Sequence, residues 1–171
     1  MRFAFIAVSL FIVQVVSALA ADIPGEKDFG AEVKGLRTKV SLVKAVVSSG
    51  QPVEIHFVKR NVSNEILVIW HSGFWPNHQI VVKDEKGQDA ALTVFGKQTR
   101  AAFSPGGDRD KNFPMELKPD TADDSEGGGD LAHYFDLSKP GKYSVQIIYE
   151  EKQRGWNGRV VSNVASFEIV K

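Results

Sequence analysis

The stretch Tyr143-Ser144-Val145-Gln146-Ile147-Ile148-Tyr149, near the end of the 171-residue chain, carries the pattern that decides the fold. Tyr143, Val145, Ile147 and Tyr149 occupy every second position, which is the period of a β-strand with one face toward a core. The turn signal Ser138-Lys139-Pro140-Gly141 precedes the stretch, and a polar loop around Gly155-Trp156 follows it. The pattern therefore predicts a long strand bounded by turns.

The same rhythm recurs upstream in short runs separated by polar turns. The run Ile66–Trp70 is apolar throughout, which is typical of a central strand covered on both faces. No stretch keeps a helical period, and residues 95–112 and 120–130, rich in glycine and charge, are expected to form long mobile loops. The other expected strands cover about residues 37–47, 53–58, 79–83, 91–94, 113–117 and 164–170.

About seven or eight strands at this spacing, with no helix to cross over, predict an all-β fold: an antiparallel two-sheet sandwich. The segment Asp136-Leu137-Ser138-Lys139-Pro140-Gly141-Lys142-Tyr143-Ser144-Val145, followed by Ser162-Asn163-Val164, resembles the final strand pair of bacterial immunoglobulin-like and fibronectin-like domains. The upstream order, with Trp70 and Leu117-Lys118-Pro119, is similar to the domain of the bacterial intracellular proteinase inhibitor family. The resemblance implies an immunoglobulin-like sandwich but no activity, because such folds host many functions.

The first 21 residues have the parts of a secretory signal peptide. Arg2 gives a basic start, residues 3–16 are largely apolar, and Ala18-Leu19-Ala20 is a small-residue cleavage signal. The apolar run is shorter than the roughly 20 residues that span a bilayer. We therefore expect a signal peptide at 1–21, an N-terminal extension at 22–32 and a β-sandwich domain at 33–171, secreted or periplasmic and without a membrane span in its mature form.

Composition argues against several classes of function. The chain has 21 basic and 21 acidic residues, so no basic surface is expected that would bind nucleic acid. It has no cysteine, which removes disulfides, thiolate catalysis, iron–sulfur clusters and thiolate zinc sites. The G-x-S-x-G signature of serine hydrolases and the HExxH signature of zinc peptidases do not occur. The sequence therefore predicts a domain that is not an enzyme and needs no cofactor.

The densest group of aromatic and histidine residues is the stretch Trp70-His71-Ser72-Gly73-Phe74-Trp75-Pro76-Asn77-His78. If they are exposed, Phe74 and Trp75, with Trp156 on a later loop, could stack on sugar rings or take the apolar side chains of a partner. The alternative is that the aromatic residues cover one end of the core, since such side chains are more often buried.

Two groups of residues could bind a metal ion. His71, His78 and His133 would supply three imidazoles and leave one position for water, although their spacing is not diagnostic. The alternative is that each histidine only makes a hydrogen bond within the sheet. The acidic stretch 120–130 could bind calcium, but its ligand order does not match an EF-hand, so a solvated loop is the preferred interpretation.

The preferred functional hypothesis is a non-catalytic binding or interaction module outside the cytoplasm. Its end loops would contact a protein or a cell-surface polysaccharide. A second hypothesis, implied only by the family resemblance, is a proteinase inhibitor that places the loop 98–112 in a protease cleft. A third is a metal-dependent activity, which requires the rings of His71, His78 and His133 within about 4 Å of a common point.

Overall fold

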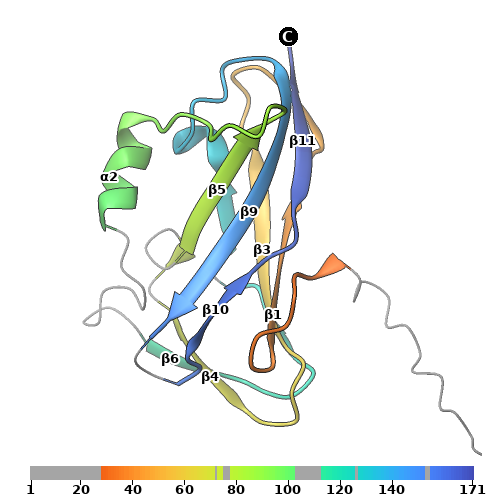
Figure 1. The fold of residues 1–171 in the computed structure, drawn as a ribbon, viewed down its shortest axis with the longest axis vertical. Helices are drawn as coiled ribbons and strands as arrows, with labels where there is room; N and C mark the ends of the chain where they lie inside the picture. Colours follow the sequence, from red (N-terminus) through yellow and green to blue (C-terminus); the bar gives the residue numbers. More distant parts are fainter. Residues whose placement is uncertain (1–27, 72, 75–77, 103–112, 126, 153–154) are drawn as a thin grey trace, which may run out of the picture.

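The computed structural model describes residues 28–71, 73–74, 78–102, 113–125, 127–152 and 155–171 (Figure 1). The predicted signal peptide and the first part of the extension lie outside the described residues. In the part that is described, eleven β-strands are accompanied by the helix α2 (Val94–Ala102) and the 3₁₀ helix η2 (Leu131–His133). No helix in these ranges has the length and apolar character needed to cross a membrane.

The largest sheet is built around β9, the strand on which the fold prediction was based. One edge of β9 pairs antiparallel with β5, and the other edge pairs antiparallel with β10 and then β11. The short strand β2 extends the sheet by pairing with β11 in parallel. The strands of this sheet are β9 (Gly141–Glu151), β5 (His78–Asp84), β10 (Gly158–Val161), β11 (Ala165–Val170) and β2 (Val46–Ser48).

The second sheet is centred on β3, which pairs antiparallel with β1 on one side and with the short strands β7 and β8 on the other. A separate antiparallel pair, β4 and β6, lies below it in the view of Figure 1. The strands of these two groups are β1 (Leu36–Leu42), β3 (Glu54–Asn61), β7 (Ala122–Asp123), β8 (Gly128–Asp130), β4 (Leu67–His71) and β6 (Phe113–Leu117).

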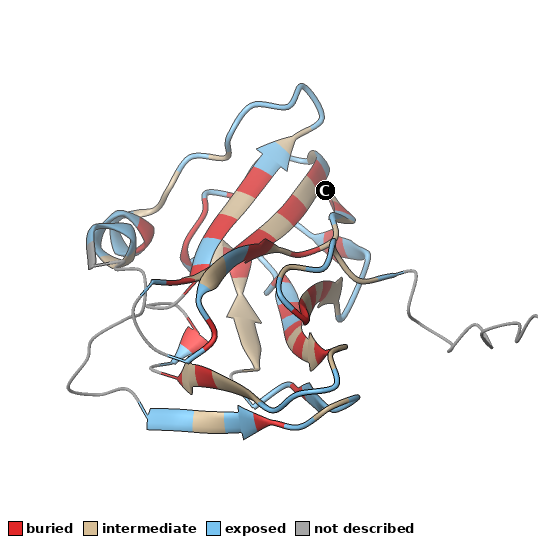
Figure 2. Ribbon diagram, turned by 60° about the horizontal axis from the view of Figure 1, so that its bottom comes forward, coloured by how far each residue is buried: buried red, intermediate tan, exposed pale blue. Residues whose placement is uncertain are grey.

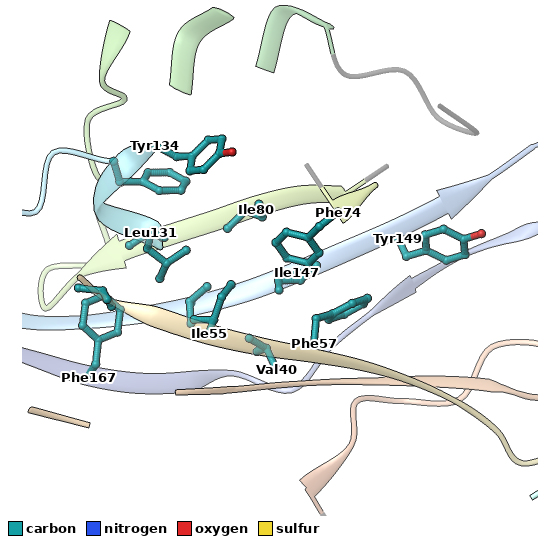
Figure 3. Packing of buried hydrophobic residues seen from close by; sticks show 14 of the residues in the cluster. Val40, Ile55, Phe57, Phe74, Ile80, Leu131, Tyr134, Ile147, Tyr149 and Phe167 are labelled. Carbon is teal, nitrogen blue, oxygen red and sulfur yellow. The ribbon is translucent and has the colours of Figure 1, made fainter. Parts of the chain in front are cut away.

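The hydrophobic core lies between the sheets of β3 and β9. Along β9 the predicted positions are buried, and buried residues alternate with more exposed ones along several strands (Figure 2). Figure 3 shows Val40, Ile55 and Phe57 from one side meeting residues of β5 and β9. The prediction of an all-β fold is thus confirmed. The strands fall into three hydrogen-bonded groups rather than two, and one pair is parallel.

The helix α2 is the largest departure from the predicted secondary structure. It occupies part of the segment expected to form a strand at 91–94 and a long loop at 95–112. The Thr93 hydroxyl caps its first turn by accepting a hydrogen bond from the Gly96 N–H at 3.0 Å. At Gly96 a Cβ atom would lie 2.0 Å from the Tyr134 carbonyl oxygen, so glycine permits the close contact between α2 and the chain after η2. Gly96 is therefore needed for close packing and does not form a turn.

Candidate functional site

A group of charged side chains is buried where β3, β4 and β7 meet; we call Lys59, His71 and Asp123 the buried polar cluster. Lys59 lies opposite Asp123 in the β3–β7 pair, and His71 is the last residue of β4. His71 Nε2 lies 3.1 Å from Asp123 Oδ2. The Lys59 side chain is 1% exposed, and its Nζ lies 4.7 Å from the centre of the Tyr149 ring. The cluster therefore holds opposite charges inside the domain.

The ionisation of Asp123 reflects these neighbours. Burial alone would raise the pKa of Asp123, but contacts with His71 and with the Ser125 hydroxyl and N–H, together with the charge of Lys59, hold that pKa well below its ordinary value. Asp123 Oδ1 accepts a hydrogen bond from the Ser125 N–H at 3.0 Å. The carboxylate is therefore charged over the neutral and mildly acidic range.

Sequence patterns did not indicate that Ser125, His71 and Asp123 lie together. Ser125 Oγ lies 3.4 Å from His71 Nδ1, on the opposite side of the ring from Asp123. These are the residue types of a hydrolytic relay, but catalysis also needs a substrate cavity beside the nucleophile. The His71 ring is buried, and the centre of the Phe113 ring, which is itself largely exposed, lies 5.4 Å from the centre of the His71 ring. These contacts hold residues 122–125 against β4.

Two carboxylates of the acidic stretch also have structural roles. Besides Asp123 in the buried polar cluster, Asp130 accepts hydrogen bonds from the backbone N–H groups of Val53, at 2.8 Å, and Ala132, at 2.9 Å. The second bond caps η2. The expectation of a solvated, mobile loop over 120–130 is therefore corrected: β7 and β8 both lie within it and pair with β3.

The three histidines proposed as metal ligands lie in different surroundings. His71 belongs to the buried polar cluster, and the His78 ring packs among Phe57, Phe74 and Tyr149, with Nδ1 hydrogen-bonded to the Phe74 carbonyl. His133 lies on η2 with its ring against that of Phe95. Across the described ranges, no three His, Cys, Asp or Glu side chains are arranged to hold a metal ion. The described histidines thus do not converge as the metal hypothesis requires.

Of the three aromatic residues proposed to bind a ligand, Phe74 and Trp156 are buried, each 5% exposed. The Trp156 ring stacks on Tyr149 at 5.6 Å, and its Nε1 donates to the carbonyl oxygens of Val33 and Lys34, each at 3.2 Å. Trp75 lies outside the described residues. The surface binding hypothesis therefore cannot rest on Phe74 or Trp156, which belong to the core as in the alternative interpretation.

The first turn of α2 presents apolar side chains to solvent. Val94 is 74% exposed and Phe95 is 45% exposed. Beside them lies a hollow of about 670 Å³, which is bordered by the turn before β3, the start of α2 and the segment after η2. We call Val94, Phe95, Lys97 and this hollow the α2 surface. Leu92, Ala132, Phe135 and Leu137 supply apolar lining.

A second, smaller cavity lies on the other side of α2, between the helix and β5. Its volume is about 170 Å³, and we call it the inner pocket. Neither hollow could be predicted from the sequence, because both depend on the helix α2, which was not predicted. The lining residues of the inner pocket are His78, Gln79, Ile80, Leu92, Gly96, Thr99, Arg100, Tyr134 and Phe135.

The inhibitor hypothesis placed its binding loop at 98–112. Residues 98–102 are the end of α2, and residues 103–112 lie outside the described residues.

Comparison with known proteins gives little guidance. No family model matches the chain, and no curated protein matches it. One similar solved structure, described as "AvmM Catalyzes Macrocyclization in Alchivemycin A Biosynthesis", is 14% identical with a TM-score of 0.36, over 83% of this chain and 95% of that chain. The protein in that structure is an enzyme, and the expectation that this domain is not an enzyme is withdrawn. A likeness this low supports no argument about what this chain itself does.

Proposed function

We propose that this chain is an extracytoplasmic binding domain that holds a protein partner on the α2 surface. The observation that carries the proposal is the adjacent exposure of Val94 and Phe95, at 74% and 45%, beside a hollow of about 670 Å³. Single exposed apolar residues are common on protein surfaces, but adjacent ones beside a hollow whose lining includes apolar side chains are typical of interaction sites.

The chemistry of the α2 surface favours a protein over a polysaccharide. Val94 is aliphatic and offers no flat ring face for a sugar. The Phe95 ring already lies against His133 and Tyr134, with ring centres 5.0 and 5.1 Å away. The neighbouring hollow, with Leu137 in its lining, suits an apolar side chain of a partner. We therefore choose a protein partner from the two classes that the sequence suggested.

We also propose that the domain is an immunoglobulin-like sandwich. Tyr143 Oη donates a hydrogen bond to the carbonyl oxygen of Lys139, four residues upstream, at 2.9 Å. A tyrosine near the start of a strand that bonds back to the preceding corner is the tyrosine corner of such domains. This contact supports the resemblance that the sequence shows around Pro140-Gly141-Lys142-Tyr143.

The binding proposal is tested by photo-crosslinking in cells that express the protein. A photoreactive amino acid replaces Val94 in one strain and Val164, which is 59% exposed on another part of the surface, in a second. We expect one discrete protein adduct from position 94 and none from position 164. Adding Phe95→Ser to the first strain should reduce that adduct at least fivefold, because the substitution removes the neighbouring apolar contact.

Two results would refute the binding proposal. Equal adducts from positions 94 and 164 would mean that crosslinking reports collision and not a specific surface. A rise in thermal midpoint with a soluble polysaccharide that Phe95→Ser abolishes would assign the α2 surface to a polymer instead.

Export is a separate prediction. The protein recovered from expressing cells should be found outside the cytoplasm and begin at Ala21 or Asp22, because cleavage would follow the Ala18-Leu19-Ala20 signal. Amino-terminal sequencing of the recovered protein tests this. Recovery of a chain that begins at Met1 in the cytoplasmic fraction would contradict the proposed location. Replacing Ala18 and Ala20 with bulky residues should leave the uncleaved chain in the exporting cell.

A further inference from the structure

The inner pocket has the size of a site for one small ring. Its volume is about 170 Å³, and apolar cavities of about 150 Å³ accept a benzene molecule. Ile80 from β5, Leu92 from the segment before α2 and Phe135 after η2 give it apolar walls. The ring of Tyr134, at the margin of the core in Figure 3, forms a further side. Its interior thus suits a compact apolar group.

One rim of this pocket carries a positive charge. Arg100, in the last turn of α2, lines the pocket, and its Nη2 donates a hydrogen bond to the Ile80 carbonyl oxygen at 3.2 Å. This bond fixes the guanidinium beside the opening, while a guanidinium has five N–H donors in all. Thr99 also lines the pocket, and among the described residues no acidic side chain belongs to the lining. The rim is therefore suited to an anion.

We infer that the inner pocket binds a small apolar monocarboxylate. The ring or branched chain lies between Ile80, Leu92 and Phe135, and the carboxylate pairs with Arg100. Guanidinium and carboxylate groups match in geometry and can form two parallel hydrogen bonds. The inference does not rest on the proposed protein partner, because the α2 surface and the inner pocket lie on different sides of the helix and share only Leu92 and Phe135 in their linings.

Phenylacetate is a suitable probe, and phenylacetamide is its neutral counterpart of the same shape. Titration calorimetry on the purified protein should give a dissociation constant for phenylacetate on the order of 0.1–1 mM, as expected for about ten non-hydrogen atoms. Phenylacetamide should bind about tenfold more weakly. In Arg100→Gln this difference should disappear, because both probes then lack a charged partner.

Lys97→Gln is the matched control, since Lys97 lies on the same helix but lines the other hollow. It should leave the preference for phenylacetate unchanged within twofold. Thr99→Trp should block the pocket and abolish binding of both probes. Should that variant fail to fold, nuclear Overhauser contacts between phenylacetate protons and the methyl groups of Ile80 and Leu92 test the same location in the unaltered protein.

The inference is overturned by any of three results. The first is equal affinity of the unaltered protein for phenylacetate and phenylacetamide. The second is an equal loss of the preference for phenylacetate in Lys97→Gln and Arg100→Gln. This result would mean that the preference depends on the total positive charge of the protein and not on Arg100. The third is the absence of contacts between the ligand and the methyl groups of Ile80 and Leu92. Failure of the crosslinking experiment at Val94 would leave these results unaffected.

Discussion

Asp123→Asn should lower the free energy of unfolding by about 3 kcal/mol at pH 7. The substitution keeps the shape of the side chain but removes the charge that faces Lys59 and His71. The His71 ring, 3% exposed and with its Nε2 3.1 Å from Asp123 Oδ2, would then lose its carboxylate partner, and the buried Lys59 would lose one attractive charge. Removing one partner of a buried charge pair is far more costly than removing an exposed pair, since the other charge stays desolvated. Urea unfolding followed by circular dichroism measures the change.

Asp124→Asn is the control for this experiment. It makes the same change of charge one residue further along, but Asp124 is exposed, so its effect should stay within about 0.5 kcal/mol. Equal effects of the two substitutions would show that the buried polar cluster contributes no stability of its own. A larger effect of Asp123→Asn alone is the expected result.

The stability that Asp123 supplies should depend on pH in a defined direction. Its pKa in the folded protein lies below its ordinary value of 3.8. The unfolded chain therefore binds a proton first, and the contribution is complete above that value and lost as the pH falls below it. The difference in unfolding free energy between the unaltered protein and Asp123→Asn should shrink between about pH 5 and pH 2.5. A difference that grows in this range would contradict the assignment of the low pKa.

The strand pattern predicted the fold class because burial in a sheet follows a period of two residues. In β9, Tyr143, Val145, Ile147 and Tyr149 are all buried, as the alternation indicated. The alternation did not predict which strands pair with one another. That β11 pairs with β2 in parallel, and that β4 and β6 form a separate pair, depends on contacts between distant segments. Alternation specifies which face is buried but not which strand lies alongside.

The helix and the candidate sites were missed for a different reason. Residues 94–102 include Gly96 and no sustained helical period, so local propensity argued for a loop. The helix is stabilised by the Thr93 cap and by close packing on the Tyr134 carbonyl, which only the tertiary structure provides. Both hollows beside α2 follow from it. The alternating pattern of charged and apolar residues likewise gave no reason to expect Lys59 to be buried.

Trp156 was considered both as a core residue and as a ligand-binding residue, and substituting it distinguishes the two roles. Trp156→Ala should lower the free energy of unfolding by about 3–5 kcal/mol. The indole is 5% exposed, stacks on Tyr149 and donates its N–H to the backbone next to β1. Its removal leaves a cavity and two carbonyl groups without that donor. Trp156→Phe should cost less, because a ring can still stack on Tyr149 while only the donor and part of the volume are lost.

The comparison with Phe113→Ala makes the Trp156 experiment decisive. Phe113 is 58% exposed, so its removal should cost less than about 1 kcal/mol. If Trp156 were a surface ligand residue, its alanine variant would resemble Phe113→Ala in stability and would lose affinity for a partner instead. If it is part of the core, Trp156→Ala destabilises the domain severalfold more than Phe113→Ala, and Trp156→Phe falls between them. The ordering of the three variants in urea therefore decides between the two roles that the sequence left open.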